Sequence, residues 1–128
     1  MKIEFEEKFR IPSATPQQRK VGGRGTHPTE GLRLARATWQ ALLEKHSPVK
    51  PMQKEAKLYV ILTYHTADQR KAGQPKTTRP DGDNLLKAIK DAATKAGWWR
   101  DDAIVFLEYI LRRWTIGEET VEISVEGE

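Results

Sequence analysis

The chain has 128 residues and a formal net charge of +4, with 38% apolar and 31% charged residues. This length holds one hydrophobic core, and the composition is typical of a globular domain, not of a disordered or membrane protein. No apolar run approaches the ~20 residues of a membrane-spanning helix, and the alternating, acidic N-terminus is unlike a signal peptide. The lack of cysteine excludes disulfides and thiolate metal sites. We therefore expect a single cytoplasmic domain over residues 1–128.

The charged residues are unevenly distributed. Both ends of the chain are acidic, whereas residues 10–36 are basic. A later segment is also basic through Arg70, Lys71, Lys76 and Arg79. This distribution favours a polyanionic partner such as nucleic acid. An ordinary mixed surface on a soluble protein is the alternative.

The first third of the chain predicts a strand, a basic loop and a helix. Apolar residues alternate over residues 2–11, which is typical of a strand. Residues 12–28 form a long loop rich in proline and glycine, and its basic character suits an arm or hairpin lying over a nucleic-acid backbone. A helix is predicted from Glu30 to about His46, with Thr29 as its N-cap. Its apolar stripe comprises Leu32, Ala35, Trp39, Leu42 and Leu43.

The remaining elements complete a mixed α/β (α+β) domain. Residues 56–65 are apolar on both faces, which predicts a central strand covered on both sides. A polar loop over residues 66–80 leads to a second helix from Asn84 to about Ala96, with Gly97 as its left-handed C-terminal cap. Strands are predicted over residues 103–115 and 120–126. The expected fold is thus a small mixed β-sheet packed by two main helices.

Two acidic pairs flank the second helix. Asp81 and Asp83 precede it, and Asp101 and Asp102 follow it. Magnesium takes oxygen ligands, usually one or two carboxylates with water and phosphate. If the strand after Asp102 lies beside the segment holding Asp81, the carboxylates converge, and a divalent cation offsets their repulsion. This interpretation predicts a metal site in a small basic protein, and hence phosphodiester chemistry.

Each acidic pair also has a structural interpretation. The Pro80–Asp83 segment is a plausible turn in which Asp83 caps the helix, and the second pair is plausible as solvated turn residues. Finding both pairs at the ends of one helix favours the metal site. Lys87, one turn into the helix, is either a solvated side chain or a contact to the scissile phosphate.

Histidine and tryptophan residues are weaker candidates. The three histidines, at positions 27, 46 and 65, lack metal-ligand spacing and are expected at the surface or at caps. Trp98 and Trp99 are expected to form a hydrophobic plug, with base stacking as the alternative. No phosphate-binding loop, dinucleotide fingerprint or zinc motif is present.

The acidic segment resembles the core motif of the RusA family of Holliday junction resolvases. The resemblance covers about Arg79 to Val105 and is carried by RPDGDNLLKA at residues 79–88. It continues through Asp91–Ala92, Gly97, Trp99 and Asp101–Ala103. The resemblance implies a homodimeric, Mg²⁺-dependent endonuclease (Mn²⁺ being possible) that cuts four-way junctions by paired nicks in DNA recombination and repair, encoded by a bacterium or phage.

Site roles follow from the resemblance. Asp81, Asp83 and Asp102 would be the catalytic carboxylates that hold the metal, and Lys87 the catalytic lysine. Contacts to the DNA backbone are expected from Arg19, Lys20, Arg24, Arg70, Lys71, Lys76 and Arg79. The alternatives are a catalytically degenerate accessory protein that binds branched DNA, and a metal-dependent phosphohydrolase acting on small nucleotides.

Overall fold

A computed structural model describes residues 1–15, 19–22 and 25–128, with residues 19–22 and 25–28 described by their backbone. The elements in chain order are β1 (Lys2–Lys8), β2 (Arg19–Gly22), β3 (Gly25–Pro28), α1 (Glu30–Glu44), β4 (Ala56–His65), α2 (Gly82–Lys95), the 3₁₀ helix η1 (Asp102–Ile104), β5 (Val105–Thr115) and β6 (Thr120–Gly127). Strand β5 was predicted to begin at residue 103. It begins two residues later, at Val105, because residues 102–104 form η1.

The main sheet has four strands in the order β1-β6-β4-β5. The β4 and β5 strands are parallel, with Tyr59 opposite Tyr109, and the other pairs are antiparallel. A parallel pair requires a crossover connection, and α2 supplies it. The predicted mixed sheet with two main helices is confirmed.

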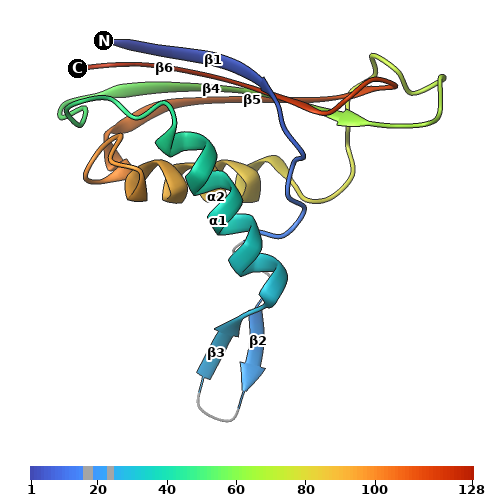
Figure 1. Cartoon of the computed structure of the whole chain (residues 1–128), viewed down its shortest axis with the longest axis horizontal. Coiled ribbons are helices and arrows are strands. Elements are labelled where there is room, and N and C mark those ends of the chain that lie inside the picture. The colour runs from blue at the N-terminus through green and yellow to red at the C-terminus, as the bar shows by residue number, and fades with distance from the viewer. Residues whose placement is uncertain (16–18, 23–24) are drawn as a thin grey trace.

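Both helices lie on one face of the sheet and form the core with it (Figure 1). Alternate β4 residues from Leu58 to Tyr64 point into this core, as do Val121, Ile123 and Val125 of β6. Trp39 of α1 is 1% exposed, as are Trp98 and Trp99, two consecutive residues that follow α2. Burial of such large side chains contributes on the order of 2–3 kcal/mol each, so these tryptophans anchor the helical layer to the sheet.

The other face of the sheet corrects one prediction. We expected β4 to be covered on both sides, but its outward residues Tyr59 and Ile61 are only half-buried in this chain. The apolar surface continues onto the edge strand β5 through Phe106, Leu107 and Tyr109, which are 59%, 36% and 46% exposed. A large apolar band on a sheet face and edge marks an interaction surface.

The sequence predicted correctly those features that depend on contacts between nearby residues. The Thr29 hydroxyl caps α1 by accepting the Leu32 N–H at 3.1 Å. Gly97 ends α2 with a φ of 84°, the left-handed conformation that glycine adopts freely. The Trp98 indole donates to the Leu43 carbonyl at 2.9 Å, which confirms the plug and links the two helices.

The basic loop between β1 and α1 contains the predicted hairpin. β2 and β3 pair antiparallel, and they project from the helical side of the molecule, away from the sheet (Figure 1). No helix among the described residues is both long and apolar enough to span a bilayer.

Candidate active site

The first acidic pair lies at the N-terminal end of α2. Asp81 is the N-cap, and its Oδ1 accepts the Asn84 N–H at 3.0 Å. Asp83 follows in the first turn, and both residues are exposed. The helix begins two residues earlier than predicted, so the capping residue is Asp81 instead of Asp83. Carboxylates here are stabilised by the positive end of the helix macrodipole.

Strand β5 holds the backbone just before this acidic pair. The Arg112 guanidinium donates to the carbonyls of Pro80 and Thr78, at 2.7 and 3.0 Å. Gly82 lies against Ile110, since a Cβ added there would be 3.2 Å from Ile110 Cγ2. The acidic pair therefore lies near the middle of β5, beside Ile110 and Arg112.

Lys76 is a structural part of the same turn. It is 7% exposed, and its ammonium donates to the Thr78 carbonyl, the Thr78 hydroxyl and the Arg79 carbonyl at 2.8–3.1 Å. The ammonium also lies 4.7 Å from the Tyr64 ring centroid and 5.3 Å from that of Trp114. Burial, and then the nearby Arg112 charge, lowers the pKa of Lys76. This lysine was predicted to contact DNA, but its donors are directed into the turn before Asp81.

The second acidic pair lies at the other end of α2. Asp101 caps η1, accepting the Ala103 N–H at 2.8 Å, and Asp102 is the first residue of η1. Asp102 therefore lies at the N-terminal end of β5, whereas Asp81 lies further along that strand, near Ile110 and Arg112. The 14 residues of α2 place its two ends ~21 Å apart. Within the described ranges, no three acidic or histidine side chains form a group able to hold a metal ion.

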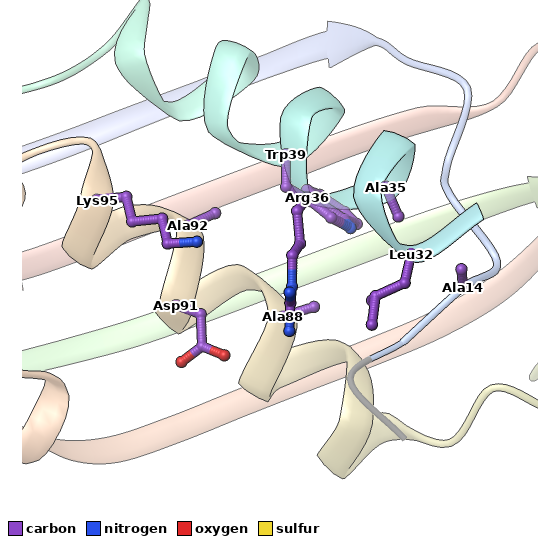
Figure 2. A pocket seen from close by; sticks show the side chains of 9 residues that line it. All are labelled: Ala14, Leu32, Ala35, Arg36, Trp39, Ala88, Asp91, Ala92 and Lys95. Carbon is purple, nitrogen blue, oxygen red and sulfur yellow. The ribbon is translucent and has the colours of Figure 1, made fainter. Parts of the chain in front are cut away.

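A charged groove surrounds Asp102. It is lined by Asp91, Thr94, Lys95, Arg100, Asp101 and Asp102, with Arg36 from α1. Figure 2 shows the adjoining seam between the helices, where Arg36 reaches over Ala88, with Asp91 and Lys95 on neighbouring turns of α2. Sequence reasoning missed Arg36 and Lys95 as neighbours of Asp102. The sequence shows that both residues occupy polar positions on amphipathic helices. It does not show that the two helices cross and bring these residues near Asp102.

The other predicted side chains fall into two groups. Arg70, Lys71 and Arg79 are exposed on the loop before α2; Arg70 pairs with Asp68 at 3.2 Å, which lowers the pKa of that carboxyl. Arg19 and Lys20 lie on β2, and Arg24 falls outside the described residues. Lys87 is exposed on the second turn of α2, on the same helix as Asp83.

The two histidines whose side chains are described, His46 and His65, have structural roles. His46 stacks on Phe5 at a centroid distance of 3.8 Å and bonds to Glu7. His65 bonds through Nδ1 to the Gly117 carbonyl at 2.9 Å. The expectation of surface or capping roles is confirmed for these two, and the His27 side chain lies outside the described ones.

Comparison with known proteins identifies the class of the chain. The family model described as Endodeoxyribonuclease RusA matches residues 9–126. The chain therefore belongs to the RusA endodeoxyribonuclease family, and so to the nucleases, which hydrolyse phosphodiester bonds. It is also 35% identical over 121 residues to the crossover junction endodeoxyribonuclease rusA of Lactococcus phage r1t, covering 84% of this chain and 86% of the relative.

Proposed function

We propose that this chain is a Mg²⁺-dependent endonuclease that resolves four-way DNA junctions by paired symmetric nicks, and that it acts in the cytoplasm as a homodimer. The observation that carries the proposal is the pair of exposed carboxylates at the N-terminus of α2, which β5 holds in place through Arg112, in a chain of the RusA family. The name of the phage relative supports a crossover junction as the substrate.

The residues at the N-terminus of α2 fit a magnesium ion. Asp81 and Asp83 provide two exposed carboxylates within one helical turn, and magnesium commonly binds one or two carboxylates together with water and substrate phosphate. When bound, such an ion polarises the phosphate and lowers the pKa of a coordinated water. Asp102 is the third proposed ligand, and it lies at the other end of α2 in the same chain.

The protein groups around this site have separate tasks. Asp81 and Asp83 would hold the ion, while the Lys87 ammonium would offset negative charge that develops on the scissile phosphate. The backbone bonds from Arg112 keep the Asp81 segment in place, because a small displacement of a catalytic group costs a large factor in rate. Cleavage by water leaves a 3′-hydroxyl and a 5′-phosphate.

Basic side chains provide the contacts to the DNA backbone. Arg70, Lys71 and Arg79 are exposed on the loop that leads to Asp81, and Arg19 and Lys20 lie on β2 of the projecting hairpin. Arg24, which lies outside the described residues, is the further basic residue proposed to contact DNA. Phosphate contacts release counterions, so each contact adds ~0.9 to the slope of log affinity against log salt. We expect Arg79→Ala to weaken junction binding and to reduce that slope by ~1.

The symmetry of the substrate supports a two-fold dimer. A four-way junction has approximate two-fold symmetry, and a dimer with the same symmetry presents one active site to each of two opposed strands. A single active site gives one nick at a time, whereas resolution requires two. A dimer therefore accounts for paired symmetric cleavage.

The test is a cleavage assay on a synthetic four-way junction, a fork and a linear duplex, each with Mg²⁺ or with EDTA. We expect Mg²⁺-dependent symmetric nicks in the junction alone, and loss of cleavage with retained binding for Asp83→Asn. Equal cleavage of the linear duplex would contradict junction selectivity, and full activity in EDTA would contradict the metal requirement.

A degenerate protein that binds branched DNA without cutting it is the second candidate. The observation that favours it is the distance between Asp102 and the Asp81–Asp83 pair within one chain. This candidate predicts tight, Mg²⁺-independent junction binding with no nicks at any enzyme concentration. The same assay therefore separates the two functions.

A further inference from the structure

We infer that Arg36, Lys95 and Arg100 bind backbone phosphates of the DNA strand that passes Asp102. The inference rests on the proposed function, since it takes DNA as the substrate, and it adds a phosphate-binding groove at the C-terminal end of α2. None of these three residues was among the basic residues that the sequence predicted to contact DNA.

The three cations come from different segments of the chain and line one groove. Arg36 is on α1, Lys95 is the last residue of α2, and Arg100 lies in the turn between α2 and η1. The groove has a volume of about 410 Å³, which is within the ~300–1,000 Å³ of ordinary ligand sites. Lys95 and Arg100 are exposed and Arg36 is half-buried. A ligand that enters the groove from solvent therefore meets all three cations.

Small side chains at the helix crossing bring Arg36 to this groove. Ala35 of α1 and Ala92 of α2 are each 4% exposed, and both line the narrow seam between the helices. Alanines at a contact let two helices approach closely, so the residue after Ala35 reaches the second helix. In Figure 2, Arg36 extends from α1 over Ala88, and Lys95 lies in the last turn of α2. The crossing therefore places a cation of one helix beside a cation of the other.

The backbone that carries Arg100 is held by buried contacts. The Trp99 indole is 1% exposed and donates to the Thr94 hydroxyl at 2.8 Å. The Met52 N–H donates to the Trp98 carbonyl at 2.8 Å, which fixes the same turn from the other side. Arg100 therefore extends from an ordered backbone, so less conformational freedom is lost when it binds a ligand.

Internal contacts leave these cations unused. Across the described residues, Arg36, Lys95 and Arg100 form no ion pair within 4 Å and no side-chain hydrogen bond. Lys90, on the same helix as Lys95, does pair with Glu108 of β5. Cations held close together repel one another, and an anion between them offsets that repulsion. The groove is therefore able to bind a negatively charged group from outside the chain.

Phosphate is the anion that suits this set of donors. Two of the three cations are arginines, and the planar guanidinium donates two parallel hydrogen bonds to phosphate oxygens. The carboxylates of the groove have other positions: Asp101 accepts the Ala103 N–H through Oδ1, and Asp102 is a proposed metal ligand. Asp91 also lines the groove, and its charge opposes an anion there. That opposition provides a variant with an effect of the opposite sign.

The groove and the basic loop before α2 contact different phosphates. The 14 residues of α2 separate its ends by ~21 Å. Arg79 comes shortly before the first end, and Lys95 forms the second. Phosphates of one strand are ~3.4 Å apart along the duplex axis, so contacts ~21 Å apart on one strand are separated by about six nucleotides. Two contacts at that spacing fix the register of the strand relative to Asp102.

The salt dependence of binding tests the groove without cleavage. Binding of a four-way junction is measured in EDTA over a series of salt concentrations. Each phosphate contact adds ~0.9 to the slope of log affinity against log salt, so Arg36→Gln, Lys95→Gln and Arg100→Gln should each lower that slope by ~1. The triple variant should lower it by ~2–3 and weaken binding by at least ~10-fold. Arg36→Lys, which keeps the charge, should retain the wild-type slope.

A matched control removes three cations from the opposite face of the sheet. Lys2, Lys8 and Lys57 alternate with core residues of β1 and β4 and so point away from the helices. Their combined substitution by glutamine should leave the slope unchanged, whereas Asp91→Asn should strengthen binding. Circular dichroism establishes that each variant is folded. A groove triple variant with the wild-type slope would overturn the inference, as would an equal reduction in the control.

Ethylation of single DNA phosphates locates the contacts. For the wild type we expect two groups of phosphates at which ethylation blocks binding. The groove triple variant should lose one group and keep the other, whereas Arg79→Ala should show the reverse pattern. Loss of the same phosphates in both variants would overturn a separate groove. A wild-type protein that binds junctions without nicking them would count against the proposed function, while the salt slopes would still judge the groove.

Discussion

The Arg112 guanidinium of β5 donates a 2.7 Å hydrogen bond to the Pro80 carbonyl, so an edge strand positions the residue next to the Asp81 N-cap. A second bond reaches the Thr78 carbonyl. These two bonds connect the chemistry proposed for Asp81 to the sheet, and they make Arg112 a positioning residue that sequence reasoning did not single out.

We predict that Arg112→Ala lowers nicking by at least ~10-fold and the free energy of unfolding by about 1.5–3 kcal/mol, the usual range for hydrogen bonds to a charged group. Junction binding should be retained. The matched control is Arg113→Ala, which removes a bond to the Thr63 hydroxyl on the opposite face of the sheet. That control should leave nicking unchanged; an equal loss in both variants would indicate a general effect on β5.

Asp81 has a structural role as well as the proposed catalytic one, and two substitutions separate them. Asparagine caps helices as well as aspartate does, so Asp81→Asn should abolish nicking while the melting temperature stays near the wild-type value. Asp81→Ala should lose activity and about 1 kcal/mol of stability. Thr29→Ala at the α1 cap is the control, with a similar stability loss and retained nicking. Activity in Asp81→Asn would remove this carboxylate from catalysis.

The buried ammonium of Lys76 should leave a signature in the pH dependence of stability. Its pKa is lowered from 10.5, first by burial and then by Arg112. Between the folded-state pKa and 10.5 the unfolded chain binds more protons, so this residue makes the free energy of unfolding rise with pH in that window. Urea unfolding at increasing pH should show this rise in the wild type relative to Lys76→Met. Parallel pH profiles for the two proteins would contradict the buried charged lysine.

An acid-sensitive contact connects β1 to the end of α1. Glu7 accepts hydrogen bonds from Lys45, at 2.5 Å, and from His46. These bonds lower the pKa of Glu7 from 4.5, so its contribution is complete above 4.5 and is lost as pH falls through the folded-state pKa. Glu7→Gln should cost ~1 kcal/mol or less at neutral pH, with the difference from wild type shrinking as the pH falls below 4.5.

The control for this contact is Glu4→Gln, which removes a pair with Lys2 on the outward face of β1. Both partners there are more than half exposed, at 55% and 56%, so the expected change in stability is close to zero at every pH. A Glu4→Gln effect as large as that of Glu7→Gln would mean that the stability change follows net charge instead of the specific contact.

Several local features of the fold were readable from sequence because neighbouring residues decide them. The apolar stripe of the helix from Glu30, its Thr29 cap and the Gly97 stop depend on contacts within one or two turns. The capping role assigned to Asp83 belongs to Asp81, a shift of two residues that the repeated acid-glycine-acid pattern left open. The plug formed by Trp98 and Trp99 followed from their size and apolar character.

Long-range placement was not readable in the same way. Lys76 has the same charge as Arg79, yet the first is buried in the turn and the second is exposed. The choice depends on the rings of Tyr64 and Trp114, which come from two different strands. The half-buried outward face of β4 was likewise not predicted, because an apolar residue gives the same sequence pattern whether or not a second layer covers it.

By itself, the sequence determined the acidic motif around α2, the elements that carry it and the family to which they belong, because these depend on residue types at short spacing. The tertiary structure alone decided where the two acidic pairs lie. Parallel strands start at the same end of a sheet, so the loop after β4 and α2 together must carry the chain back before β5 begins. Asp81 and Asp102 are therefore separated by the length of a helix within one chain, a separation that residue spacing in the sequence does not reveal.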